Sequence, residues 1–139
     1  MVASIVILTP MEMRINPLRM LGLPLGDAHT VQNAGGRASD DAIRSILDSQ
    51  QLLGALEVIV VHHTDCVLAE TSNETLRERL GRGLDADISG VDFLPLARDL
   101  MASTREDVAR LRSSPGLAPG TTIHGYLHDV RTGTLSPVE

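Results

Sequence analysis

The sequence has almost no aromatic side chains and no lysine. Among its 139 residues are one Phe, one Tyr and no Trp, and all 12 basic residues are Arg. Because 42% of the residues are nonetheless hydrophobic, the core must be built from Val, Ile, Leu, Met and Ala. The chain is acidic, with a formal net charge of −6, and its arginines are scattered, so we expect no nucleic-acid partner.

The sequence also has a single cysteine, Cys66, and no long apolar run. One cysteine excludes an intrachain disulfide and is typical of a reducing cytoplasm. No apolar run reaches the roughly 20 residues of a membrane-spanning helix, and residues 1–10 are too short and uncharged for a signal peptide. We therefore expect one cytoplasmic domain over residues 1–139, with no membrane partner.

The first half of the chain has the pattern of a parallel α/β sheet. Residues 3–8 and 58–61 are apolar runs that do not alternate, which is typical of buried parallel strands, and residues 27–33 indicate another strand. Between them, Ser39 offers an N-cap to an amphipathic helix that Gly54 ends. The order strand, strand, helix, strand predicts parallel pairing with helices on the faces of the sheet.

The second half predicts more helices and two further strands. Asn73 can cap a short helix, and residues 93–102 read as another. Ser103 and Glu106 have the spacing of a capping box that would begin one more helix. Residues 121–130 alternate as a strand, and a turn then leads to a short antiparallel strand near residue 135.

The third apolar run ends in His62, His63, Asp65 and Cys66, where a buried strand should give way to a loop. His63 and Cys66 have the His-x-x-Cys spacing of half a zinc site, because structural or catalytic zinc uses three or four nitrogen, sulfur or oxygen ligands. His62 should point to the opposite face of the strand. Cys66 as an inert buried thiol is the plainer alternative.

Four segments together resemble the short bacterial β-class carbonic anhydrases. They are Asn33-Ala34-Gly35-Gly36-Arg37, Asp40-Asp41, HHTDC at residues 62–66 and HGYLHDVRTGTL at residues 124–135. Their order along the chain is that of the family, and the combination is specific although each piece alone is weak. The resemblance implies a parallel sheet with helices on its faces, and homodimers or tetramers built from dimers. It also implies an active site at the carboxyl ends of the strands, near the dimer interface, whose wall Asn33, Gly35 and Gly36 would shape.

The resemblance also implies a zinc ion held by two cysteines and one histidine. His63 and Cys66 occupy two of these ligand positions. The segment that should carry Cys-x-Asp-x-Arg instead reads Pro10-Met11-Glu12-Met13-Arg14, so Pro10 stands at the first cysteine position. The chain also begins at the first strand, so the family's N-terminal helical arm is expected to be missing.

These departures leave several hypotheses open. Glu12 can complete a Glu/His/Cys zinc site and keep the CO2-hydrating reaction, or Glu12 and Arg14 can form an ion pair beside an incomplete site. In the second case the pocket would act on another small molecule, with Glu12, Arg14 and Asp65 as catalytic candidates, or the chain would be a non-catalytic binding or partner subunit. The sequence thus predicts the pocket and leaves open the bound zinc, the substrate and whether the protein is an enzyme.

Overall fold

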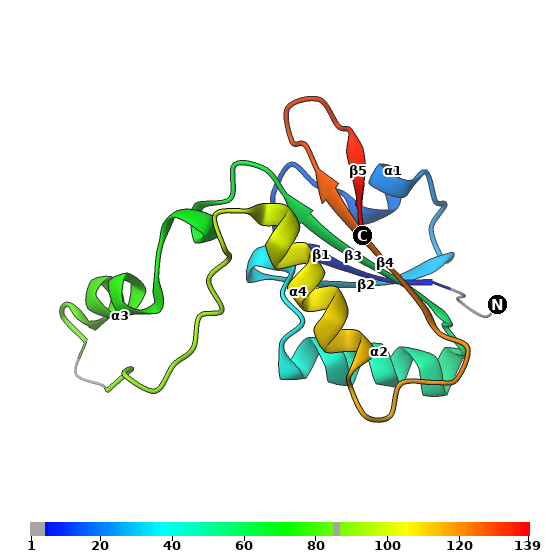
Figure 1. The fold of residues 1–139 in the computed structure, drawn as a ribbon, viewed down its shortest axis with the longest axis horizontal. Coiled ribbons are helices and arrows are strands. Elements are labelled where there is room, and N and C mark those ends of the chain that lie inside the picture. The colour runs from blue at the N-terminus through cyan, green and yellow to red at the C-terminus, as the bar shows by residue number, and fades with distance from the viewer. Residues whose placement is uncertain (1–4, 85–86) are drawn as a thin grey trace.

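The computed structural model describes residues 5–84 and 87–139, and within them the chain forms one five-stranded sheet (Figure 1). The strands are β1 (Ile5–Pro10), β2 (Ala28–Asn33), β3 (Glu57–His63), β4 (Thr122–His128) and β5 (Leu135–Val138), in the order β2-β1-β3-β4-β5. The first four are parallel and β5 is antiparallel to β4. The expected α/β fold is confirmed; Ala3 and Ser4, expected in the first strand, lie outside the described residues.

Helices cover both faces of the sheet (Figure 1). On one face, alternate residues of β1 and β3 pack with α2 (Asp40–Leu53) and α4 (Leu100–Arg112). Val6 of β1 and Val58 of β3, for example, share one core cluster with Leu111 of α4. Ile7 and Val61 face the other way and pack with α1 (Pro17–Leu21) and the β4–β5 hairpin. Because both faces are covered, the strands read as continuous apolar runs in the sequence.

The predicted signals that begin and end α2 are present. The Ser39 side chain accepts a hydrogen bond from the Ala42 backbone N–H, and Gly54 ends the helix in the left-handed conformation. The chain from β2 to α2 passes through a short turn, η1 (Ala34–Gly36), at the carboxyl end of the sheet. This turn and the loop after β3 are what place the side chains of the candidate site.

The helix predictions between residues 73 and 112 need two corrections. Ser72, and not Asn73, caps α3 (Asn73–Gly81), because the Ser72 hydroxyl accepts the Thr75 N–H. Residues 93–99 are not helical, and Ser103 does not start a helix. Asp99 caps α4 through two backbone N–H groups, while the Ser103 hydroxyl is buried and accepts the Ala97 N–H.

The α3 helix lies at the end of a long excursion away from the sheet (Figure 1). It has no buried residue and follows the 3₁₀ turn η2 (Val67–Glu70). Among the described helices, none is both long and apolar enough to cross a membrane.

Candidate functional site

A pocket of about 390 Å³ opens at the carboxyl ends of β1 and β3. The residues that the sequence pointed to and that line it are Pro10, Glu12, Arg14, Gly35, His63, Asp65 and Cys66. Open parallel α/β sheets bind ligands at this edge, because the loops that follow neighbouring strands converge there. The fold therefore brings together residues from three separate segments of the chain.

The pocket wall beside Pro10 is formed where the backbone at Gly36 passes very close to the backbone of β1 and β3. A Cβ on Gly36 would lie 2.7 Å from the Val61 carbonyl oxygen and 2.8 Å from the Pro10 nitrogen, so no other residue fits without movement. Asn33 holds the same turn, since its side chain accepts the Arg37 N–H and donates to the Arg37 carbonyl, each at 2.8 Å. Of the predicted wall residues, Gly35 lines the pocket directly, while Asn33 and Gly36 fix the turn from behind.

Glu12 and Arg14 form a two-pronged ion pair. Arg14 donates from Nε to Glu12 Oε1 at 2.8 Å and from Nη2 to Oε2 at 3.1 Å, and its backbone N–H also donates to Oε1. These hydrogen bonds, the Arg14 side chain first among them, lower the pKa of Glu12 to about 2. The carboxylate is therefore ionised at neutral pH, and both of its oxygens are engaged.

His63 and Cys66 form a second polar pair in the pocket. The hydrogen bond with Cys66 raises the pKa of His63 in spite of partial burial, and the imidazole Nδ1 faces the Thr64 carbonyl oxygen. Burial acts to raise the pKa of the Cys66 thiol, but hydrogen bonds from His63 and from backbone groups outweigh it, so the pKa is lowered. This direction favours a thiolate beside an imidazolium, the pairing that activates cysteine as a nucleophile.

Asp65 lines the pocket in an unusual backbone conformation. Its φ is 55°, in the left-handed region that Asp tolerates better than most residues. Its carboxylate accepts a hydrogen bond from Arg131 Nε at 2.9 Å, which ties the loop after β3 to the β4–β5 turn. The side chain thus ties the loop in place through one of its oxygens, and its catalytic role stays a prediction.

His62 faces away from the pocket and belongs to a buried charged cluster. Its Nε2 is 2.8 Å from Asp107 Oδ2, and the same oxygen is 2.9 Å from Arg37 Nε. Arg37 also donates to the Pro95 carbonyl at 2.8 Å, so the cluster joins β3, α4 and the residue that follows η1. The opposite orientation of His62 was predictable from strand alternation, but its partners were not, because Asp107 lies 45 residues further along the chain.

The side chains of the pocket are grouped differently from the ligands of a catalytic zinc ion. Of the side chains around the pocket, His63 and Cys66 offer ligands, Pro10 has none, both Glu12 oxygens are held by Arg14, and one Asp65 oxygen is held by Arg131. Among the described residues, no three His, Cys, Asp or Glu side chains are grouped to hold a metal ion. Catalytic zinc sites use three protein ligands; the hypothesis that Glu12 supplies the third stays a prediction.

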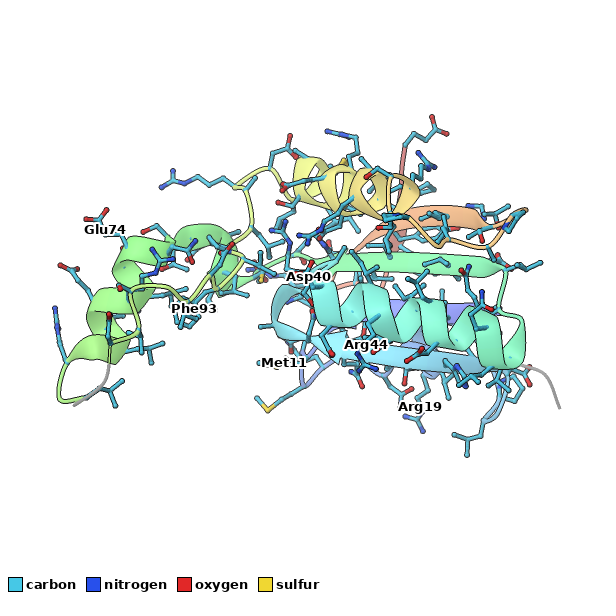
Figure 2. All side chains as sticks on the ribbon, turned by 90° about the horizontal axis from the view of Figure 1, so that it is seen from below. Met11, Arg19, Asp40, Arg44, Glu74 and Phe93 are labelled. Carbon is cyan, nitrogen blue, oxygen red and sulfur yellow. The ribbon has the colours of Figure 1, made fainter. Side chains whose placement is uncertain are left out.

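Several pocket residues were not predicted from the sequence. Val67 and Leu68 line the pocket directly after Cys66, and Met11 lines it directly after Pro10. Met11 is 68% exposed and reaches away from the ribbon in Figure 2. Their proximity in sequence to Pro10 and Cys66 was the only available signal. Together they make much of the pocket surface apolar.

Comparisons with known proteins give closely similar chains. A β-carbonic anhydrase 1 from Mycobacterium tuberculosis is 34% identical over 137 residues, which cover 96% of this chain and 81% of that protein. A carbon disulfide hydrolase from Saccharolobus solfataricus is 32% identical over 151 aligned positions, covering 93% of this chain and 74% of that protein. The chain matches no protein-family model.

Solved structures agree with these sequence matches. The crystal structure of a carbonic anhydrase from Streptococcus mutans superimposes with a TM-score of 0.93 and 43% identity, over 99% of this chain and 82% of that one. A tetrameric β-carbonic anhydrase from Sordaria macrospora has a TM-score of 0.75 at 16% identity, over 99% of this chain and 81% of that chain, and so supports the fold alone.

Proposed function

Because this chain belongs to the β-carbonic anhydrase family, we propose that it is a member in which zinc-dependent CO2 hydration has given way to metal-independent chemistry on another small molecule. One observation carries the proposal. Proline occupies the position of the family's first thiolate ligand, and the nearby carboxylate, Glu12, has both oxygens bound to Arg14. Without a third protein ligand, a zinc-bound water of lowered pKa has no stable support.

The Cys66–His63 pair is the reactive group that we propose for this pocket. A thiolate is a strong nucleophile. The neighbouring imidazolium can donate a proton to the group that the thiolate attacks. The apolar rim, which includes Met11 and Val67, favours a small uncharged molecule over a polar one. A similar chain acts on carbon disulfide, according to its name, which supports a small electrophilic carbon centre as the substrate class.

The roles of the other pocket residues follow from their contacts. We propose that Arg14, held by Glu12, presents its remaining Nη1 group to negative charge that develops on the substrate. Asp65 keeps the loop after β3 in place through Arg131. The protein is further proposed to be a homodimer, as the family resemblance implies and as exposed apolar side chains such as Val67 beside the pocket support.

The decisive experiment restores the family motif. The double variant Pro10→Cys/Glu12→Asp supplies the missing thiolate and the shorter acid. We expect about one zinc per chain and measurable CO2 hydration in this variant, whereas the unaltered protein purified from the same zinc-supplemented medium should contain less than about a tenth of an equivalent. Zinc is measured by inductively coupled plasma mass spectrometry and hydration by stopped-flow pH change.

The controls separate the alternatives. Pro10→Ser/Glu12→Asp removes the proline without adding a thiolate and should gain neither zinc nor activity. If the unaltered protein binds one zinc and hydrates CO2, and Glu12→Gln loses both, the proposal is wrong and Glu12 completes the metal site.

A further inference from the structure

A second hollow, of about 590 Å³, lies on the α1 side of the sheet. Its walls come from the β1–α1 connection, from α1 and from the β4–β5 hairpin. In Figure 1 α1 and β5 lie next to each other, and apolar residues of α1 and β5, such as Leu18 and Leu135, belong to one cluster. The hollow is separate from the pocket described above except for one shared residue, Arg14.

The hollow has a positive lining in an acidic protein. Arg14 and Arg19 both line it, and among the described residues none of those that line it is acidic. Arg14 gives Nε and Nη2 to Glu12 and keeps Nη1 unused in that pair. For Arg19, no ion pair or side-chain hydrogen bond forms within the described part of the chain. Two guanidinium groups therefore have donors left over.

Two neutral groups add further donors. His128 lines the hollow, is only 8% exposed, and its Nδ1 is buried without a hydrogen-bond partner among the described residues. Asn16 accepts the Arg19 N–H through Oδ1, which leaves its side-chain amide N–H groups available. A buried polar atom without a partner costs folding free energy, so its presence here needs an explanation.

We propose that this hollow binds a small oxyanion, either a phosphate group or a carboxylate. Guanidinium groups match the planar or tetrahedral oxygens of such anions, and histidine and asparagine N–H groups complete the donor set. The donors of Arg19, Asn16 and His128 line this hollow alone, whereas Arg14 Nη1 is the group that the proposed function assigns to the first pocket. Because Arg14 lines both hollows, an anion bound here would lie beside a residue that also lines the first pocket.

The test is a titration of the full chain with inorganic phosphate and, in a separate arm, with acetate, at constant ionic strength. Binding is followed by ¹H–¹⁵N chemical shifts. We expect saturable shifts at Arg19, Met20 and Gly133.

Arg19→Gln should weaken binding by about fivefold or more, since one of the two guanidinium charges is lost. Figure 2 places Arg44 on α2, where it pairs with Asp41 and Asp48, so Arg44→Gln is the matched control and should bind as the unaltered protein does.

The arm that saturates at lower concentration identifies the class of anion. The proposal is overturned if neither anion saturates below about 50 mM, if Arg19→Gln and Arg44→Gln weaken binding equally, or if the shifts are confined to residues of the first pocket such as Leu68. Arg19 is exposed, so its replacement should leave the fold intact, and circular dichroism checks this.

Discussion

At the scale of single residues, the site depends on backbone geometry as much as on reactive groups. Gly36 has a φ of 67°, and its missing Cβ lets the turn after β2 touch β1 and β3. The neighbouring atoms, the Val61 carbonyl oxygen and the Pro10 nitrogen, are backbone atoms of the central strands and cannot move aside cheaply. The position of the pocket wall is therefore set by glycine at this point.

A matched pair of substitutions isolates this effect. Gly22 has the same φ of 67°, but a Cβ added there would meet nothing within 4 Å. Gly22→Ala should cost about 1–2 kcal/mol for the left-handed backbone alone. Gly36→Ala should lower the free energy of unfolding by about 1–3 kcal/mol more, because of the added clash. Urea denaturation measures both; equal losses would show that the clash is relieved.

The residues of the pocket were predictable to different degrees. His63, Cys66 and Glu12 were visible because each sits at the end of a strand in a recognisable spacing. The Glu12–Arg14 ion pair was one of two alternatives, and the structure contains it, while Glu12 as a metal ligand stays a prediction. The hollow around Arg19 and His128 could not be predicted, because it joins residues more than 100 positions apart in the chain and no local pattern marks it.

At the scale of secondary-structure elements, the buried cluster of Arg37, Asp107 and His62 fixes α4 against the sheet. The cluster joins three elements through one carboxylate, and the side chains of Arg37 and Asp107 are only 7% and 2% exposed. Such a carboxylate cannot be removed without leaving a buried guanidinium unpaired. The end of β3 is thereby held from the face opposite His63, which links α4 to the geometry of the pocket.

Replacing this carboxylate should be costly. Asp107→Asn removes the charge that balances Arg37, and we expect the free energy of unfolding to fall by about 3 kcal/mol or more. Asp41→Asn breaks an ion pair with Arg44 that is largely exposed, so its effect should stay within about 0.5 kcal/mol. Thermal and urea unfolding of the two variants compare a buried with an exposed pair. Similar losses would mean that the buried cluster adds little.

Strands and α2 were predicted well because their signals are local. Apolar runs, the Ser39 cap and Gly54 decide these elements within a few residues of sequence. The predicted helix over residues 93–102 forms only at residues 100–102, the start of α4, and was wrong for residues 93–99 because a distant contact intervenes. Arg37 donates to the carbonyls of Leu94 and Pro95, and this distant contact holds a non-helical segment where the sequence pattern favoured a helix.

At the scale of the whole molecule, the proposed homodimer can be measured directly. Val67 is 75% exposed at the pocket rim and Leu52 is 79% exposed at the end of α2. Light scattering at tens of micromolar should give twice the mass of one chain. Val67→Asp should shift the mass toward the monomer, since it places a charge in an apolar interface, whereas Leu52→Asp should not. A monomeric unaltered protein would contradict the proposal.

The two edge strands of the sheet, β2 and β5, differ in how well they could pair with a strand of another chain. β5 forms one margin, has only four residues and carries Pro137, which has no backbone N–H to offer to an incoming strand. β2 forms the other margin, with six residues, none of them proline. If strands add at the β2 edge and not at the β5 edge, two chains can pair once, β2 against β2. The pair then exposes only its two β5 edges. A proline and a short strand at the β5 edge thus disfavour growth into an open-ended filament through this sheet.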